Sequence, residues 1–270
     1  MKEPFFFGIP LVSRAGATDW AVIERLFSLT LRSLLAQTDR DFSVILAAHD
    51  VPAAWHDVPA AWHRVSREPG FHLIRADWAP EPPTSANDDG GRKKWLIKQA
   101  VRARAGGLLM FLDADDWVAS DLVEKVRAVM HPRHIGAVVT NGFALDYATL
   151  RLARFPIAGA FDGPFHALCG SCTIGRVVAA ASEPHLLDPH AVLGSHHDWE
   201  GRATQNGFSL AHPAAEGLYM VGTSENHSEC HGPFAEWRRH VTRAVRSRGT
   251  LLEPGLAQAF GQNIDELSSA

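Results

Sequence analysis

The first half of the chain alternates between short apolar runs and a longer segment with helical spacing. Apolar runs typical of buried strands cover residues 5–12, 42–48 and 71–75. Between the first two, residues 20–37 carry apolar side chains three and four positions apart, which predicts an amphipathic helix. Strand, helix and strand in this order form the βαβ unit of a parallel sheet. The pattern therefore predicts an α/β fold.

Later segments give a less regular pattern. Helical spacing predicts helices at 92–104 and 120–130, and strands are expected at 135–140 and 147–155. A further helix is expected at 176–182, within a stretch rich in glycine and proline. The helix at 92–104 would begin with three cations, which oppose the helix dipole, so an anionic group is expected nearby.

One segment carries the clearest candidate chemistry. The apolar run from Gly106 to Phe111 leads directly into three carboxylates, Asp113, Asp115 and Asp116. Alternation along a strand predicts that Asp113 and Asp115 face one ligand and that Asp116 points elsewhere or begins a turn. Mg²⁺ and Mn²⁺ bind through such carboxylates together with substrate phosphates. The alternative is that these residues only end the strand and begin a turn.

Composition limits the possible domain size, partners and cellular location of the protein. The 270 residues are 46% hydrophobic, which suffices for one large domain with or without an appendage. The 26 basic and 30 acidic side chains give a charge of −4, so no nucleic-acid partner is expected. Only three cysteines and no apolar run of about 18 residues predict a cytoplasmic protein. Cys169 and Cys172 have zinc-like or redox spacing, but without a second such pair a packing role is favoured.

A short duplication precedes the third strand. Val-Pro-Ala-Ala-Trp-His occurs at 51–56 and again at 58–63. Two copies are too few for a repeat fold, and Pro59 breaks any helix running through both. We expect Trp55 and Trp62 to pack on the domain, with sugar stacking as the alternative.

Three separated segments resemble the family-2 glycosyltransferases, nucleotide-sugar-dependent enzymes with the GT-A fold. They are Ile9-Pro-Leu-Val-Ser-Arg14, the first helix and second strand within 33–46, and Phe111-Leu-Asp-Ala-Asp-Asp116, which resembles the DxD segment. The resemblance extends from about residue 5 to residue 228. It implies a mostly parallel sheet flanked by helices over 1–232, followed by a C-terminal helical extension over 233–270.

The resemblance assigns the donor site. It implies that Asp115 coordinates the Mn²⁺ or Mg²⁺ ion that bridges the donor diphosphate, while Asp113 contacts the ribose or supports the site. Arg14 and Asp50 would lie around the nucleotide base and sugar. The family often has Asp-Asp-Gly-Ser after the second strand, whereas this chain has residues 49–52 as His-Asp-Val-Pro, so the base is not specified.

A second departure precedes the acidic strand. The family often has Arg-Asn-x-Gly there, and this chain has Ile-Lys-Gln-Ala at 97–100. Lys94 or Lys98 would approach the donor phosphates, or both belong to a solvated basic face of the helix. The sequence does not separate these two interpretations.

Two downstream segments supply the remaining candidates. His197-Asp198-Trp199-Glu200 resembles the segment that provides the catalytic base of inverting members, which makes Asp198 the candidate base and Glu200 the second choice. A helix-capping role is the alternative for Asp198. His227 fits the position of a family histidine that reaches the metal or diphosphate, although a structural role is equally favoured.

The extension has its own pattern. Phe234, Trp237, Val241 and Val245 share one face of a basic helix over 234–248, which packs on the domain or rests on an anionic membrane at its inner face. The tail after residue 249 is expected to be only partly ordered.

The resemblance implies metal-dependent transfer of a sugar from a nucleotide diphosphate donor to a hydroxyl acceptor, with inversion. A surface polysaccharide or glycolipid is the acceptor class it suggests. Two other classes of protein would account for the same residues. One is a nucleotidyltransferase or phosphohydrolase with this acidic site, and the other is a noncatalytic module that binds a nucleotide or carbohydrate.

Overall fold

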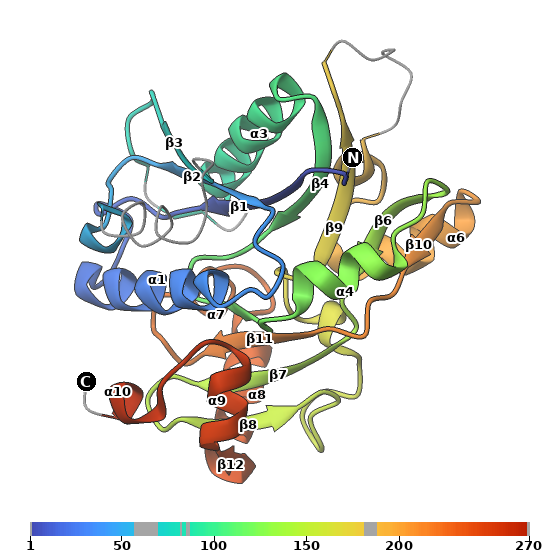
Figure 1. Ribbon diagram of the computed structural model, residues 1–270. Helices are drawn as coiled ribbons and strands as arrows, with labels where there is room; N and C mark the ends of the chain where they lie inside the picture. Colours follow the sequence, from blue (N-terminus) through green and yellow to red (C-terminus); the bar gives the residue numbers. More distant parts are fainter. Residues whose placement is uncertain (1, 57–69, 82, 85–86, 181–187, 269–270) are drawn as a thin grey trace.

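A computed structural model describes the chain except for residues 1, 57–69, 82, 85–86, 181–187 and 269–270. It contains a seven-stranded main sheet and a five-stranded second sheet. Helix α1 (Trp20–Leu35) lies between the two sheets, and helix α3 (Asp88–Ala103) covers the other face of the main sheet (Figure 1). The second copy of the duplication, with Trp62, lies outside the described residues.

The main sheet is mostly parallel, as predicted. In spatial order its strands are β10 (Ser209–Ala211), β6 (His134–Val138), β9 (Thr173–Val178), β4 (Gly106–Phe111), β1 (Phe5–Pro10), β2 (Ser43–Ala48) and β3 (Phe71–Arg75). Only β9 runs against its neighbours, β4 and β6. The α/β fold class is thereby confirmed.

Alternation along β1 explains why helices cover both faces. Phe5, Phe7 and Ile9 belong to one buried cluster with the inner face of α1. Phe6 points the other way and packs with Ile97 of α3. A strand buried on both faces has no polar positions, which is why residues 5–12 read as one continuous apolar run.

The second sheet carries the C-terminal part of the chain. Its order is β12 (Thr250–Leu251), β8 (Arg151–Arg154), β7 (Asn141–Asp146), β11 (Glu216–Val221) and β5 (Trp117–Val118). Leu26 and Leu29 of α1 pack with Trp117, Met220 and Phe260 in its core. Helix α1 therefore contributes to the cores of both sheets.

Shorter elements complete the fold. They are α4 (Leu122–Val129), α5 (Pro189–Val192), α6 (Trp199–Gln205), α7 (His227–Cys230), α8 (Ala235–Arg248), α9 (Pro254–Ala259), α10 (Ile264–Ser268) and the 3₁₀ turns η1 (Phe165–Ala167) and η2 (His196–Asp198). None of the described helices combines the length and the apolar character needed to cross a bilayer.

Three expectations about elements were wrong. Residues 176–178 of the expected helix at 176–182 are instead the end of strand β9, because Thr173–Val178 fills the gap between β4 and β6, and residues 181–182 lie outside the described residues. Helix α3 begins at Asp88 rather than Arg92, so its first turn is acidic and favours the dipole. The tail after residue 249 forms β12, α9 and α10, because Ala257 and Phe260 are fully buried there.

Two other segments are partly as expected. Of the strand expected at 147–155, residues 151–154 form β8, and residues 147–150 form the hairpin turn that joins it to β7. Strand β7 itself was not expected. Trp55 packs on the domain as predicted, 5% exposed and stacked 6.3 Å from the Phe27 ring. The predicted packing role of that tryptophan is therefore confirmed.

Candidate active site

The three carboxylates after β4 lie in a tight turn rather than in extended strand. The Asp116 N–H donates to the Asp113 carbonyl at 3.2 Å across this acid turn, residues 113–116. Asp113 and Asp115 line the same cleft, although the turn rather than strand alternation places them there. Asp116 points into the protein body and is 1% exposed.

Asp116 joins the acid turn to two other segments. Its Oδ2 accepts hydrogen bonds from the Ser171 hydroxyl at 2.7 Å and the Cys169 thiol at 3.4 Å, and its Oδ1 accepts from the Met220 N–H of β11 at 2.9 Å. Ser171 Oγ also accepts from the Asp113 N–H at 2.9 Å. Burial, followed by the charge of Asp113, raises the pKa of Asp116 to about 7. Asp116 therefore acts as a structural link.

Asp115 stands in a crowded electrostatic environment. Its Oδ2 accepts a hydrogen bond from the Asn226 side-chain amide at 2.9 Å. Burial raises the pKa of Asp115 well above its usual range, and the charges of Asp116 and Asp113 raise it further. A cation bound in the cleft would relieve this repulsion between carboxylates.

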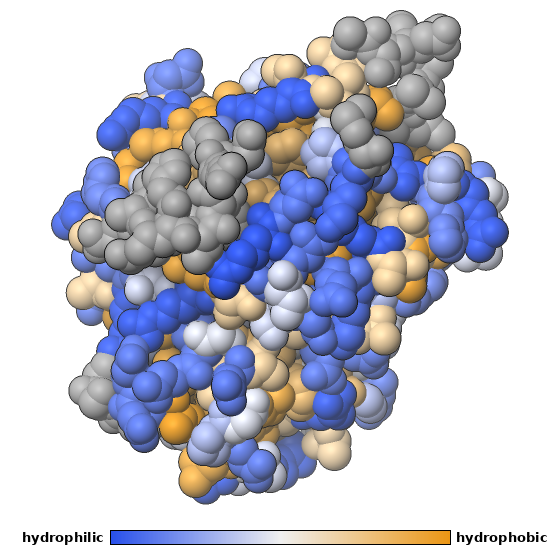
Figure 2. All heavy atoms as spheres, in the orientation of Figure 1, coloured by the Kyte–Doolittle hydropathy of each residue, from blue (hydrophilic) through white to orange (hydrophobic). Residues whose placement is uncertain are grey.

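The cleft has a volume of about 280 Å³ and lies beyond the carboxyl ends of β1 and β4. Ligands bind at such sheet edges in open α/β folds. Hydrophilic side chains gather across the middle of the face seen in Figure 2. Much of the cleft wall comes from the end of β1 and the loop after it (10–18), the start of α3 (87–94), the acid turn, and the loop and helix after β11 (224–231), and α1 and β11 also contribute.

The two candidate lysines have different surroundings. Lys94 lines the cleft, with its Nζ 3.9 Å from Asp113 Oδ1 and 5.7 Å from the centre of the Phe111 ring. Lys98 is absent from the cleft wall and forms an ion pair with Asp188, the N-cap of α5. The structure therefore brings Lys94, but not Lys98, to the acid turn.

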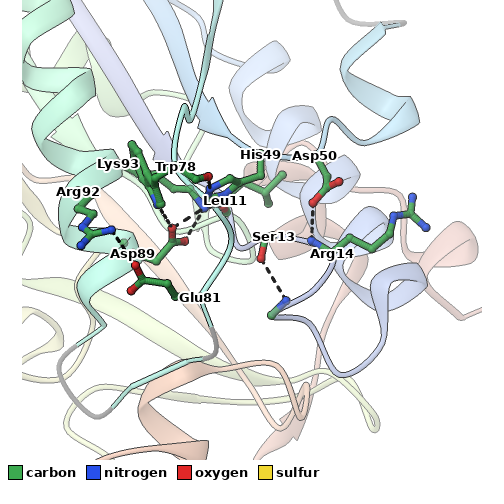
Figure 3. A network of polar contacts seen from close by, with 12 residues as sticks. Leu11, Ser13, Arg14, His49, Asp50, Trp78, Glu81, Asp89, Arg92 and Lys93 are labelled. Carbon is green, nitrogen blue, oxygen red and sulfur yellow. Dashed lines mark hydrogen bonds and ion pairs between the residues drawn. The ribbon is translucent and has the colours of Figure 1, made fainter.

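A third lysine lines the cleft and was not identified from the sequence. Lys93 is fully buried, and its Nζ donates to the Leu11 carbonyl at 2.6 Å and to Asp89 at 2.5 Å (Figure 3). Asp89 also accepts from the Trp78 indole at 3.0 Å, and His49 Nε2 lies 3.0 Å from the Trp78 carbonyl. Burial lowers the pKa of Lys93, whereas Asp89 opposes this change. The i,i+4 spacing of Asp89 and Lys93 was the available signal.

Arg14 and Asp50 interact through the main chain. Asp50 Oδ2 accepts a hydrogen bond from the Arg14 backbone N–H at 2.7 Å, which holds the loop after β1. The Arg14 guanidinium lies 4.8 Å from the centre of the Trp20 ring and points away from the Lys93–Asp89 pair (Figure 3). Neither Arg14 nor Asp50 contributes to the wall of the cleft.

The loop after β11 reaches across the cleft. His227 begins α7 and lines the cleft, with its ring centre 5.0 Å from that of His231. The Glu225 carboxylate accepts hydrogen bonds from the backbone N–H groups of Thr18 at 3.0 Å and Asp19 at 2.6 Å. These two bonds connect the loop that carries His227 to the start of α1.

Asp198 lies outside the wall of this cleft. Its carboxylate is 36% exposed and lies 3.6 Å from His197 Nε2 and 3.5 Å from Arg202. Glu200, the second choice, is 2.7 Å from His212 Nε2. The structure thus does not group either carboxylate with Asp113 and Asp115.

The turn η2 that carries Asp198 is nevertheless close to the acid turn. A Cβ added to Gly170 would lie 3.3 Å from Asp113 Oδ2 and 3.9 Å from the His196 ring. Gly170 therefore lies between them and, having no side chain, leaves room there. Burial lowers the pKa of His196 to about 4, so this ring is neutral at pH 7.

The cysteines fall into two environments. Cys169 and Cys172 are fully buried in the main core with free thiols, in agreement with the packing interpretation. Cys230 is exposed and lines the cleft. Cys230 is thus the one cysteine whose reactivity can report on the cleft.

Within the described part of the chain, no three His, Cys, Asp or Glu side chains converge as a complete metal site. Mg²⁺ commonly takes only one or two protein carboxylates, and substrate phosphates and water complete its shell. Asp113 and Asp115 fit this partial role because both line the cleft, and His227 lies in the same wall. The residues present are therefore suited to a cation that binds together with a phosphate-bearing substrate.

No protein-family model matches the chain, and comparison with curated proteins gives no match. Among solved structures it is similar to TarS from S. aureus, with 12% identity, 96% of this chain and 42% of that chain covered, and a TM-score of 0.43. It is also similar to GalNAc-T7 with UDP, GalNAc and Mn²⁺, with 11% identity, coverage of 82% and 44%, and a TM-score of 0.44.

A third similar structure is the mannosyltransferase PcManGT from Pyrobaculum calidifontis in complex with GDP-Man and Mn²⁺. The identity is 15%, the coverage is 96% of this chain and 69% of that chain, and the TM-score is 0.41. The chain spans less than half the length of TarS and GalNAc-T7.

Proposed function

We propose that the protein is a GT-A-like glycosyltransferase that moves a sugar from a nucleotide diphosphate donor to a hydroxyl acceptor with the help of Mn²⁺ or Mg²⁺. One observation carries the proposal: Asp113 and Asp115 line a polar cleft at the carboxyl end of β4, and Lys94 lies 3.9 Å from Asp113. Carboxylates for a cation and a cation for a diphosphate are thus combined in one place.

The donor site is assigned as follows. Asp115, with Asp113 and His227, would hold the cation, and Lys94 would contact the diphosphate. When bound, the cation would stabilise negative charge on the departing diphosphate. Asp50 and Arg14 would act at the nucleoside end by holding the loop after β1, since Asp50 fixes the Arg14 backbone. Lys98 would not contact the donor itself and would support the donor site only through its ion pair with Asp188.

Asp198 is the proposed general base of an inverting transfer. The acceptor oxygen would form a bond to the anomeric carbon while the bond to the diphosphate breaks, and Asp198 would take the acceptor proton. The proximity of η2 to Asp113 across Gly170 supports this assignment. The nucleoside diphosphate leaves with the bonding electrons.

Helix α8 is the proposed contact with a glycolipid or membrane surface. Two of its basic side chains, Arg239 and Arg243, form ion pairs with Glu236 of the same helix. At its N-terminal end, the N-cap residue Phe234 is 67% exposed and Trp237 is 38% exposed. Exposed aromatic side chains beside cations are typical of contact with a membrane interface. A surface polysaccharide or glycolipid would then be the acceptor.

Product analysis tests the reaction type. The protein would be incubated with a panel of nucleotide diphosphate sugars and Mn²⁺, and the nucleotide product identified by chromatography. Release of a nucleoside diphosphate supports glycosyl transfer. Release of pyrophosphate or free phosphate would instead support the nucleotidyltransferase or phosphohydrolase, and donor binding without turnover would support the noncatalytic module.

A further inference from the structure

Asn226 is buried at the point where the loop after β11 meets the acid turn. It is 6% exposed and occupies the N-cap position of α7, directly before His227. Its side-chain amide donates to Asp115 Oδ2 and to the Met220 carbonyl, each at 2.9 Å. Its Oδ1 accepts from the Thr223 hydroxyl at 2.8 Å. Every polar atom of this side chain therefore has a partner.

These contacts allow only one orientation of the amide. Both Asp115 Oδ2 and the Met220 carbonyl are acceptors, so a flipped amide would place oxygen against two oxygens. The hydroxyl of Thr223 supplies the donor on the other side. Asn226 therefore holds the Asp115 carboxylate through a fixed donor.

The local turn has its own support without this side chain. Thr223 Oγ1 accepts hydrogen bonds from the backbone N–H groups of Glu225 at 3.0 Å and Asn226 at 3.1 Å. The bond to Asp115 spans 111 residues of sequence and is not part of that turn. The turn alone thus does not explain the amide facing a carboxylate of the cleft.

We propose that Asn226 is a positioning residue for Asp115. It fixes the orientation of the Asp115 carboxylate, which would bind a divalent cation in the cleft, and it links the loop that carries His227 to the cation site. This inference rests on the proposed function, because it requires a cation at Asp115. Hydrogen-bond partners of metal-binding carboxylates typically change metal affinity by 10- to 100-fold when removed.

The test measures Mn²⁺ binding to the whole protein by electron paramagnetic resonance, without donor and without turnover. Asn226→Ala is expected to weaken Mn²⁺ binding by about tenfold or more. Asn226→Leu, which keeps more of the side-chain volume, is expected to show the same loss if the alanine variant folds poorly. The matched control is Asn206→Ala, because the side-chain amide of Asn206 donates to the Arg202 carbonyl on an exposed surface, and its loss should leave binding unchanged.

Two results separate the inference from the function on which it rests. If Asp115→Asn abolishes Mn²⁺ binding while both Asn226 variants bind as wild type, Asn226 is structural and the inference is wrong. If Asp115→Asn binds Mn²⁺ normally, the proposed cation site is wrong as well. In steady-state assays the Asn226 variants should raise the KM for Mn²⁺ and retain most of kcat at saturating Mn²⁺. A fall in melting temperature without these changes would also overturn the inference.

Discussion

The acid turn and the turn that carries Asp198 are supported in opposite ways. Asp116 is buried and accepts three hydrogen bonds from two other segments, which fix Asp113 and Asp115 next to it. The Asp198 carboxylate is partly exposed and forms ion pairs with His197 and Arg202. Surface ion pairs are worth little, so Asp198 can change partners at small cost. The donor half of the proposed site is preformed, whereas the acceptor half is free to adjust.

The largest effect is expected at the preformed half. Asp115→Asn should lower kcat/KM by about 10³-fold or more, because the loss of cation binding removes several kcal/mol of charge stabilisation. Steady-state kinetics with Mn²⁺ measures this change. Asp265→Asn, at an exposed carboxylate on α10, is the control and should behave as wild type. Equal activity of both variants would show that the acid turn is not a cation site.

A somewhat smaller effect is expected at the adjustable half. Asp198→Asn should lower kcat by about 10²-fold or more, as expected for the loss of a general base. Because Asp198 lies outside the donor cleft, the affinity for a nucleoside diphosphate should remain unchanged. Isothermal titration calorimetry together with single-turnover rates separates these quantities. A loss of nucleotide affinity, or an unchanged turnover rate, would show that Asp198 is not the general base.

The rigidity of the acid turn also predicts a pH dependence of stability. The pKa of Asp116 is raised from 3.8 to about 7 by burial, so the folded state holds this proton more tightly than the unfolded chain. The stabilising contribution is complete below about pH 4 and is lost as pH rises through 7, about 4 kcal/mol in all. The free energy of unfolding, measured in urea from pH 4 to 8, should fall more for the wild type than for Asp116→Asn. Parallel curves for the two proteins would contradict the assignment.

A smaller effect is expected for the proposed contact between α8 and a membrane. Phe234→Ala combined with Trp237→Ala should reduce binding to anionic phospholipid vesicles severalfold, because each exposed aromatic contributes apolar area. Co-sedimentation with the vesicles measures the bound fraction. Trp95→Ala, at a tryptophan 57% exposed on α3, is the matched control. Equal binding by the wild type and both variants would exclude this surface.

The smallest effect concerns labelling of the cleft. Cys230 should react with iodoacetamide slowly, because partial burial of its sulfur and nearby Glu229 and Glu225 raise the pKa of its thiol. A nucleoside diphosphate with Mn²⁺ should slow the reaction further, since Cys230 lines the cleft. Mass spectrometry follows the modification, with the buried Cys169 as an internal control. An equal rate of labelling with and without the nucleotide would show that the nucleotide binds outside this cleft.

The elements that the sequence predicted well are those with one dominant signal. The strand at 71–75 matches β3, and the helix expected at 20–37 is α1, because a short apolar run marks the strand and a clear helical period marks the helix. Strand β9 was mistaken for a helix because it is short and completes a sheet between partners distant in sequence. Such long-range pairing leaves no local pattern.

The same distinction applies to the site. Asp113 and Asp115 were identified because three acids follow one apolar strand, and the structure places both on the cleft. The i,i+4 spacing of Asp89 and Lys93 indicated that pair, but not that Lys93 is buried at the cleft, because its burial depends on the carbonyl of Leu11, 82 residues away. Asn226 was missed for the same reason, since its partner Asp115 is remote in sequence. Contacts that only the fold creates cannot be inferred from spacing.

The central claim is that a divalent cation and a diphosphate bind together beside Asp115. The most direct measurement is the melting temperature of the wild-type protein with each common nucleoside diphosphate, in Mn²⁺ and in EDTA. A ligand present at about 100 times its Kd adds about 2.7 kcal/mol of stability, which is readily detected. We expect at least one nucleotide to raise the melting temperature in Mn²⁺ and not in EDTA. Equal shifts in both conditions, or no shift with any nucleotide, would contradict the claim.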